Sequence, residues 1–352
     1  MSASMTVGFH DNNHNNKHNK QEKQLMTTKA LRHTALISAA LFMSAASAQA
    51  QTLRLNHNNP EDHPTHVSMQ YMSERLSELT DGELDIRIYA NAQLGSQRES
   101  MELVQNCTLD MARSNTAELE AFEPMYSAMN LPFIFESEEH FERVINGDIG
   151  QDILNASRDK GFIGVAFLTE GARSFYGDRA IQSPADLEGL NIRVQPSPSA
   201  VRMVELLGGN PTPIDWGELY SALQQGVVEM AENNPTALTN ARHGEVASHF
   251  SLDEHTIIPS VVVISSCAWD RMSEDQQAAM RQAASEAQAF HSDSWNKAAM
   301  AALETAETEM GVEINEVDKA PFIEAVMPMH DEVANQSAEL ADLISRIKSE
   351  AN

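Results

Sequence analysis

Basic side chains are scarce in this chain. Its 352 residues include 24 Lys and Arg against 51 Asp and Glu, which gives a formal net charge of −27. The imbalance is larger after residue 50, because residues 51–352 hold 19 basic and 49 acidic side chains, a formal charge of −30. Nucleic acid is bound through a basic face, so this composition excludes nucleic acid as a partner. Self-repulsion among so many acidic groups favours a protein that stays soluble and monomeric.

Long apolar runs are also lacking. The strongest candidate, residues 35–46, is too short to span a bilayer, which requires ~20 residues. It follows Lys29 and Arg32 and precedes Ala48-Gln49-Ala50, an arrangement typical of a cleavable secretory signal. We therefore predict a signal peptide at 26–50.

Residues 1–25 come before this signal and are rich in Asn and His without an apolar period. Histidines in such a tract could form a metal-binding tail. We instead interpret residues 1–25 as an upstream extension, with Met26 as the true start. The mature protein is then expected to begin near Gln51 and to lie in the periplasm, outside the inner membrane.

Cysteine is nearly absent, and the two that occur are Cys107 and Cys267. An oxidising compartment permits a disulfide between them. Such a bond requires a Cα separation of about 4.4–6.8 Å, which a sequence does not supply. The residues alone leave the pairing open.

Motifs of catalysis are missing as well. The chain has no nucleophile elbow, no Gly-rich phosphate loop and no Gly-x-Gly-x-x-Gly opening a helix. An enzyme on an α/β scaffold is therefore disfavoured, and we expect no cofactor. Two groups of side chains offer zinc ligands: His57, His63 and His66, and His243, Glu245, His249 and His255. Neither group has an i, i+4 His pair with a distant third ligand, so we expect no metal.

Strand and helix patterns alternate at the start of the mature chain. Alternating runs at 52–56, 83–89 and 109–113 predict strands, and the apolar periodicity of 64–79 and 97–106 predicts helices between them. Strands that alternate with helices are typical of a parallel sheet with helices on both faces. The predicted fold class is therefore α/β.

Some 300 mature residues suit two lobes better than one core. A β-branched run at 257–265 would return the chain to the first lobe, and an alanine-rich helix from Ser273 past Met310 is long enough to brace both. We predict lobe I at 51–170 plus 262–300, and lobe II at 171–261 plus 301–352.

The stretch from Pro211 to Asn234 is the most informative about function. Asp215 is the predicted N-cap of a helix, and Glu218 is placed to close a capping box. Gly226 is placed to end this helix with a positive φ. A short extended run then ends on Glu232-Asn233-Asn234. Ligands in open α/β sheets bind beyond the carboxyl ends of strands, so these polar groups are candidate contacts.

This stretch, with its Pro-Thr-Pro, Trp216, Glu-x-Tyr-x-Ala-Leu-Gln and Glu-Asn elements, resembles the solute-binding proteins of tripartite ATP-independent periplasmic (TRAP) transporters. A second block, from Gly171-Ala-Arg-Ser-Phe-Tyr176 to Gly189-Leu-Asn-Ile-Arg-Val-Gln195, matches the same family. The resemblance covers the chain from about Thr52 to the last helices. It implies a two-lobed periplasmic binding protein, a Venus flytrap, that delivers a small organic acid to a sodium-driven TRAP permease.

Two positions depart from the family pattern. Glu229-Met230 replaces the usual Asp-Gly, which implies an altered local turn if that glycine has a positive φ. Cys107 occupies a position where the family tends to have glycine, which implies that Cys107 and Cys267 are two unpaired thiols.

The resemblance also assigns roles to individual residues. Arg193 lies between apolar neighbours, and pattern alone favours a structural salt bridge there. The resemblance implies instead that its planar guanidinium makes a bidentate pair with the ligand carboxylate. Arg173 matches a second ligand-reaching arginine, Asn233 an asparagine that supports the carboxylate or a hydroxyl, and Trp216 an aromatic residue that packs over the ligand. Asn234 is the next residue in the chain after Asn233 and is a further candidate ligand contact.

The first lobe is expected to contribute polar contacts too, and the candidates are Glu99, Asn115 and His63. Each fits equally well as a capping or loop residue.

The ligand class also follows from resemblance. Four segments resemble the sequences of the subgroup that binds hexuronates such as glucuronate and galacturonate. They are residues 171–176, 231–234, 242–246 and 251–256. Other sugar acids, C4-dicarboxylates and α-keto acids are alternatives, as is a sensing protein without a permease. Binding would close the two lobes about a hinge.

Overall fold

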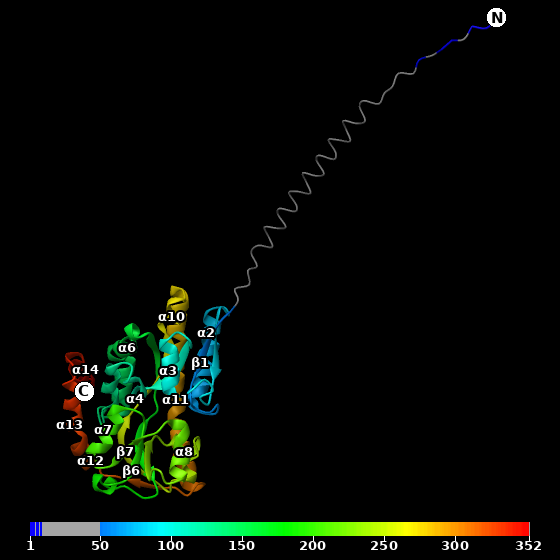
Figure 1. The fold of residues 1–352 in the computed structure, drawn as a ribbon. Coiled ribbons are helices and arrows are strands. Elements are labelled where there is room, and N and C mark those ends of the chain that lie inside the picture. The colour runs from blue at the N-terminus through cyan, green and yellow to red at the C-terminus, as the bar shows by residue number, and fades with distance from the viewer. Residues whose placement is uncertain (4, 7, 9–49, 352) are drawn as a thin grey trace. The chain divides into compact units, whose positions relative to one another are not determined.

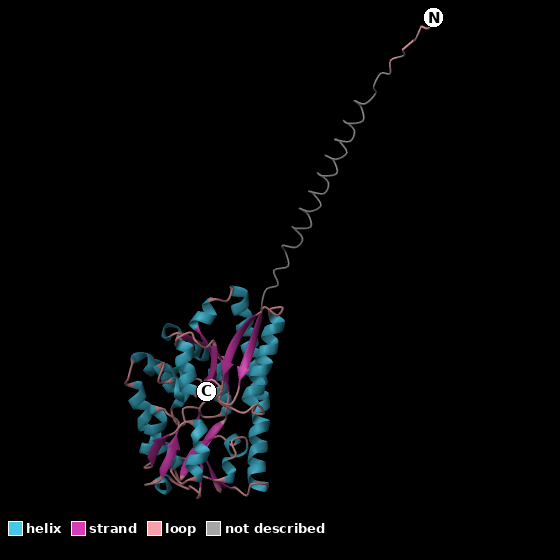
Figure 2. Ribbon diagram, turned by 45° about the vertical axis from the view of Figure 1, so that its right-hand side comes forward, coloured by secondary structure: helices cyan, strands magenta, loops and turns pink. Residues whose placement is uncertain are grey.

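The computed structural model describes residues 50–351 and, near the N-terminus, residues 1–3, 5, 6 and 8. The predicted signal peptide therefore lies outside the described residues, apart from its last position, and so does most of the upstream extension. Within the described residues, no helix is both long and apolar enough to cross a membrane. The strands form two sheets, which Figure 2 shows in magenta as two groups, one above the other.

The first sheet has the strand order β2-β1-β3-β10-β4. Strand β1 pairs in parallel with β2 and β3, and β10 runs antiparallel to both β3 and β4. As a result, β1, β3 and β4 point the same way and end at one edge of the sheet. The strands are β1 (Gln51–Asn56), β2 (Leu84–Tyr89), β3 (Met111–Asn115), β4 (Phe162–Leu168) and β10 (Ser260–Ser265).

The second sheet has the order β11-β9-β5-β8-β6-β7. Strand β6 is parallel to β7 and β8, whereas β5 is antiparallel to β8 and β9. The start of β5 therefore lies at the same edge as the ends of β6 and β8. The strands are β5 (Ala172–Gly177), β6 (Asn191–Val194), β7 (Asn210–Pro213), β8 (Met230–Asn233), β9 (His249–Ile257) and β11 (Glu313–Glu316).

Helices cover these sheets and connect their strands. The first follow the predicted pattern closely: α2 (Pro64–Leu79) begins with Pro at its first position and buries Met69, Met72 and Leu76 at helical spacing. The others are α3 (Gln97–Gln105), α4 (Thr116–Leu119), α5 (Glu138–Asn146), α6 (Asp148–Asn155), α7 (Pro198–Leu206), α8 (Trp216–Gln224), α9 (Thr236–Thr239), α10 (Ser266–Asp270), α11 (Glu274–Thr308), α12 (Ala320–Val326), α13 (Pro328–Ala334) and α14 (Ala338–Ser349), with 3-10 turns η1 (Pro124–Asn130), η2 (Arg158–Lys160), η3 (Pro184–Leu187) and η4 (His243–Glu245).

Helix α11 braces the two sheets, as predicted (Figure 1). It begins at a complete capping box between Ser273 and Gln276. Its first half buries alanines such as Ala283 and Ala287 in the core of the first sheet. Its last turns bury Ala306 in a cluster with Tyr176 and Phe250 of the second sheet. One continuous helix therefore contributes to the cores of both halves.

Several predicted boundaries were wrong. The extended run predicted at 257–265 is broken: β9 ends at Ile257 and β10 begins at Ser260. Helix α11 ends at Thr308, before Met310, and β3 ends two residues later than predicted, so Asn115 is its last residue rather than the one after it. Met230 is a buried residue of β8 instead of a turn residue, and its side chain packs against Gly177.

The capping box predicted at the start of α8 does not form either. Asp215 occupies the N-cap position, but its side chain makes no capping hydrogen bond. The carboxylates of Asp215 and Glu218 instead border a cavity. The predicted end of this helix is correct in kind, because Gly226 follows the C-cap residue with φ of 69°.

The expectation of two unpaired thiols was wrong. Cys107 and Cys267 form a disulfide, with their Cα atoms 5.8 Å apart. Cys107 follows α3 with φ of 59°, and Cys267 lies in α10. The chain returns to the first sheet through β10, which brings α10 beside the end of α3. Proximity in the fold, and not spacing along 160 residues of chain, decides the pairing.

Candidate ligand-binding site

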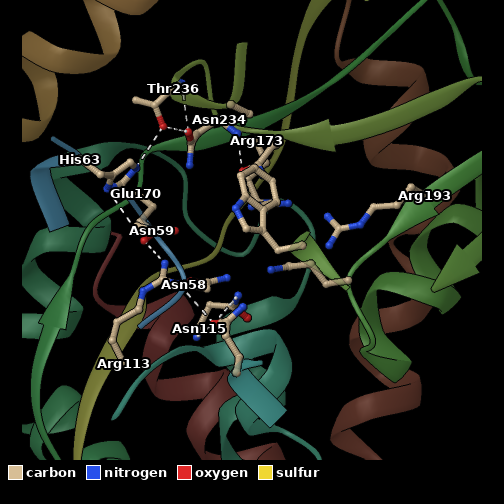
Figure 3. Close-up of a pocket in the computed structure, with 15 residues that line it drawn as sticks. Asn58, Asn59, His63, Arg113, Asn115, Glu170, Arg173, Arg193, Asn234 and Thr236 are labelled. Atoms are coloured by element: carbon tan, nitrogen blue, oxygen red, sulfur yellow. Dashed lines mark hydrogen bonds and ion pairs between the residues drawn. The ribbon is translucent and has the colours of Figure 1, made fainter. Parts of the chain in front are cut away.

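A buried pocket lies where the carboxyl edges of the two sheets face each other (Figure 3). Residues just after β1, at the end of β3 and just after β4 enter it from the first sheet, and residues at the ends of β6 and β8 and the start of β5 enter it from the second. Its cavity volume is about 40 Å³, well below the roughly 300–1,000 Å³ of typical small-molecule sites. The lining residues are Asn58, Asn59, His63, Gln97, Arg113, Asn115, Glu170, Arg173, Arg193, Gln195, Trp216, Asn233, Asn234, Thr236 and Ala237.

Arg173 is held by the end of β8. Its Nε donates to Glu232 Oε2 at 2.6 Å and its Nη2 to Glu232 Oε1 at 2.9 Å, a two-point ion pair. Its Nη1 donates to Asn233 Oδ1 at 2.7 Å. Burial by itself raises the pKa of Glu232, but Arg173 and His255 more than offset this, and the pKa falls to about 2. Arg173 therefore already has its carboxylate.

A buried histidine supports this pair from the next strand. His255 Nε2 lies 3.5 Å from Glu232 Oε2, and its Nδ1 lies 2.7 Å from Asp253 Oδ2. Burial disfavours the imidazolium, but the two carboxylates, Asp253 first, raise the pKa of His255 to about 9. Asp253, His255, Glu232 and Arg173 thus form an alternating chain of buried charges whose sum is zero.

Arg193 differs from Arg173 in having no carboxylate. It is only 2 % exposed, and its one side-chain hydrogen bond within the described residues runs from Nε to the Ile214 carbonyl at 2.9 Å. Its Nη1 is buried with no partner among the described residues. Burial lowers the pKa of Arg193, because desolvation penalises the charged form. The salt bridge that pattern alone favoured for Arg193 is not formed.

Trp216 packs over Arg193. The Arg193 Cζ lies 5.9 Å from the centre of the indole ring, a cation–π distance. Trp216 is the first residue of α8 and lies beside the end of β6. It is only partly buried. Trp216 also lines the pocket. The side chain is therefore free to pack against a ligand on one side and the guanidinium on the other.

On the first-sheet side, Arg113 and Glu170 form a second buried ion pair. Glu170 also accepts a hydrogen bond from Ser260 Oγ at 2.7 Å, and Arg113 Nη1 donates to Asn58 Oδ1 at 3.0 Å. Gln97 Oε1 accepts from the Asn115 backbone at 3.0 Å and from Arg113 Nη1 at 3.2 Å. The pattern of the sequence did not single out Arg113, Glu170, Asn58 or Gln97. Arg113 ends a predicted strand, Asn58 and Glu170 follow strands, and Gln97 begins a predicted helix; these positions at element ends were the available signal.

The first-lobe candidates occupy different places. Glu99 is exposed and outside the pocket, because its carboxylate accepts from the Ser96 N–H at 2.8 Å in the capping box of α3. Gln97, two residues earlier, is the residue of this helix that lines the pocket. Asn115 caps α4, which confirms its capping role, and it also lines the pocket, so its contact with a ligand stays a prediction.

His63 likewise combines a cap and a pocket position. Its Nδ1 accepts from the Thr65 N–H at 3.2 Å, and burial lowers the pKa of His63 to about 3. The neutral ring therefore carries its proton on Nε2, which lies 3.4 Å from Thr236 Oγ1 of α9. Because α2 belongs to the first sheet and α9 to the second, this contact joins the two halves across the pocket.

Asn233 is the last residue of β8 and Asn234 follows it, so the strand ends one residue earlier than predicted, and both residues line the pocket. Asn233 Oδ1 accepts from Arg173 and from the Asn234 N–H, while Asn234 Oδ1 accepts from Thr236 Oγ1 at 2.7 Å. The side-chain N–H₂ of Asn233 forms no hydrogen bond within the described residues. It is therefore a free donor at the pocket wall.

The two histidine groups considered for zinc are taken up by other contacts. His57 Nε2 lies 2.9 Å from His66 Nδ1, and His243 Nδ1 lies 2.8 Å from the Tyr176 hydroxyl. Across the described part of the chain, no cluster of three or more His, Cys, Asp or Glu side chains is placed to hold a metal ion.

Two α/β sheets that face each other across a buried polar pocket, with one helix bracing both, define a binding protein that encloses a small molecule between its halves. The profile of the family described as bacterial extracellular solute-binding protein, family 7, matches residues 55–337. The chain belongs to this family, whose members serve TRAP transporters.

Known relatives agree with this assignment. A TRAP periplasmic solute-binding protein from Anaerococcus prevotii, solved with bound D-glucuronate, is 35% identical with a TM-score of 0.83, and the match covers 85% of this chain and 98% of that one. One from Xanthobacter autotrophicus, solved with β-D-galacturonate, is 37% identical with a TM-score of 0.82, covering 84% and 99%. A solute-binding protein of Chromohalobacter salexigens is 32% identical over 93% of this chain and 98% of its own length.

Proposed function

We propose that this protein binds a hexuronate, glucuronate or galacturonate, in the pocket between its sheets and delivers it to a sodium-driven TRAP permease. One observation carries the choice of ligand. Of the three arginines that line the pocket, Arg113 and Arg173 each hold a buried carboxylate, whereas Arg193 has none within the described residues. A buried guanidinium without a counter-ion is strongly disfavoured, so the pocket is completed by one carboxylate from the ligand.

The single unpaired arginine also favours a uronate, which has one carboxylate, over a dicarboxylate, which has two. A C4-dicarboxylate would bring a second carboxylate with no unpaired cation to receive it. Burying an unpaired charge costs far more than burying hydroxyl groups that find partners. The rest of the pocket offers such partners, including the side-chain N–H₂ of Asn233 and the oxygens and amides of Asn58 and Asn59. A polyol with a single carboxylate therefore fits best, and the bound uronates of the two solved relatives support this choice.

We also infer binding without conversion. The pocket has one hydroxyl–histidine contact, between Thr236 and His63. Thr236 Oγ1 donates its proton to Asn234 Oδ1, and the accepting nitrogen of His63 already receives the Thr65 N–H. This pair does not supply a base beside a nucleophile, as covalent catalysis requires. Export through the signal peptide predicted at 26–50 would place the protein in the periplasm.

A thermal-shift panel tests the proposed ligand class. Glucuronate and galacturonate should raise the melting temperature, because a ligand that binds only the folded state stabilises it. Glucose and galactose, which lack the carboxylate, should not. Succinate tests the charge count and should give a smaller shift than either uronate. Equal shifts from glucose and glucuronate would contradict the carboxylate clamp at Arg193.

A further inference from the structure

A second, larger cavity adjoins the ligand pocket. Its volume is about 480 Å³, and it is partly open to solvent. Three residues line both spaces: Asn58, Gln97 and Trp216. The two spaces therefore adjoin, and these three side chains form the wall between them.

A buried carboxyl group without a partner lines this cavity. Glu118 of α4 is only 4 % exposed, yet its carboxylate forms no hydrogen bond or ion pair within the described residues. Burial, reinforced by Asp215 from the second sheet, raises the pKa of Glu118 to about 7 against the opposing influence of Arg193, Arg98 and Arg113. The carboxylate oxygens of Glu118 are not sealed from solvent and face the cavity, so they are available to accept hydrogen bonds from a ligand.

The chemistry of the cavity wall selects against a second anion. Its described lining includes the carboxylates Glu118, Asp215 and Glu218 but no Lys or Arg. Burial lowers the pKa of His243, the lining histidine, to about 3, so that it adds no positive charge. Carboxylates accept hydrogen bonds from sugar hydroxyls, and the faces of Trp216 and Tyr220 suit the C–H face of a sugar ring.

We propose that this cavity is a second subsite that takes a neutral sugar unit, so that the protein binds a uronate linked to a neutral sugar as well as a free uronate. The inference rests on the uronate-binding function proposed above. The uronate carboxylate pairs with Arg193, Trp216 packs between the two units, and the Glu118 carboxylate accepts a hydrogen bond from a hydroxyl group of the neutral unit. A second uronate unit is disfavoured by the carboxylates of Asp215 and Glu218, and by that of Glu118 where it is ionised.

Gly217 provides a way to block the cavity alone. It lines the cavity but not the pocket, and a Cβ built on it would meet no atom within 4 Å. Gly217→Trp therefore adds a large side chain at the cavity wall without a clash in its own backbone surroundings. Gly217→Ala is the matched control, because it makes the same backbone change without filling space.

The test is calorimetric titration of the full mature protein with three ligands: glucuronate, a glucuronosyl–galactose disaccharide and digalacturonate. In the wild type, the disaccharide should bind with an affinity within about tenfold of that for glucuronate. Digalacturonate should bind at least ~30-fold more weakly than glucuronate, the lower end expected for an unpaired buried charge.

Gly217→Trp should weaken disaccharide binding by ~5- to 150-fold, as overpacking does, and change glucuronate binding by less than about threefold. Gly217→Ala should leave both unchanged. Glu118→Gln should reduce the discrimination against digalacturonate.

The outcomes separate this inference from the proposed function. If glucuronate binds but the disaccharide does not, the second subsite is wrong and the uronate pocket stands. If the disaccharide binds equally well to the wild type and to Gly217→Trp, it binds elsewhere, and the subsite is again wrong. If neither ligand binds the wild type, both the proposed function and the subsite are overturned.

Discussion

Arg173 and Arg193 line one pocket, yet only Arg173 is neutralised by the protein, through Glu232 at 2.6 Å. The two arginines therefore have different interactions within the protein. Arg173 and its carboxylate hold the end of β8 and contact Asn233, whereas Arg193 has no carboxylate partner within the described residues and is the proposed partner of the ligand carboxylate. This division leads to separate expectations for variants of each.

Arg193→Lys keeps the charge but loses the planar fork that makes two parallel hydrogen bonds to one carboxylate. Truncating one partner of a buried charge pair typically costs ~2–5 kcal/mol, which is roughly 30- to several-thousand-fold in affinity. We expect Arg193→Lys to weaken glucuronate binding clearly and Arg193→Ala to weaken it more, as measured by calorimetry. Both variants should fold, because Arg193 has no carboxylate partner in the protein to lose.

The opposite result would be equally informative. If Arg193→Ala bound glucuronate normally but lost several kcal/mol of folding stability, Arg193 would be a structural residue. The ligand carboxylate would then have to be sought at Arg173.

Glu232→Gln should destabilise the fold, because it leaves Arg173 buried without its counter-ion. Breaking a buried ion pair from one side typically costs ~3–5 kcal/mol. Glu332→Gln is the matched control, since Glu332 pairs with Arg202 at 2.7 Å at the surface, where such pairs contribute ~0–1 kcal/mol. Urea unfolding of both variants measures the difference. Equal losses would show that the Arg173–Glu232 pair does not stabilise the fold beyond a surface pair.

Folding stability should fall as the pH rises from 6.5 to 9. The pKa of His255 is raised from 6.5 to about 9 in the fold, so its contribution is complete below pH 6.5 and is lost as pH rises through the folded value. The full effect is of the order of 3 kcal/mol. His255→Gln should flatten this part of the curve, while His249→Gln, a partly exposed residue of the same strand, should not. An unchanged slope in His255→Gln would rule out the buried imidazolium.

The acid side of the same curve has the reverse sign. Burial lowers the pKa of His63 and of His243 to about 3, so the unfolded chain binds protons more readily there. Stability should therefore also fall as the pH drops below 6.5. Glucuronate binding, followed over the same range, distinguishes loss of the fold from loss of the site.

Removing the disulfide should weaken the fold without changing the ligand affinity. The Cys107–Cys267 bond closes a long loop and lies outside the pocket lining. Losing a native disulfide typically costs ~2–5 kcal/mol. Cys107→Ser/Cys267→Ser should melt at a lower temperature and bind glucuronate with an unchanged Kd. A change in Kd of tenfold or more would show that the disulfide between α3 and α10 affects ligand binding as well as stability.

The bound uronate should be released unchanged. The Thr236–His63 contact does not supply a base, and the family is one of binding proteins. Incubating the protein with glucuronate for hours and analysing the ligand by mass spectrometry measures this. Accumulation of any product above that of a protein-free control would contradict the assignment.

The sequence by itself determined the local elements that have strong periodic patterns. Helix α2 has the predicted bounds, Pro64–Leu79, because its apolar residues recur at helical spacing behind a proline start. The two family blocks also located Arg173, Arg193, Asn233 and Trp216 in one pocket without any coordinates.

Tertiary structure decided what those residues do. Which arginine is free depends on Glu232 reaching Arg173 across two antiparallel strands, a register that no local pattern encodes. The disulfide depends on β10 returning α10 to the end of α3. Gln97 lines the pocket where Glu99 was expected, because the capping box of α3 occupies Glu99. These are contacts between segments far apart in the chain, and their energies depend on distances that only the folded protein sets.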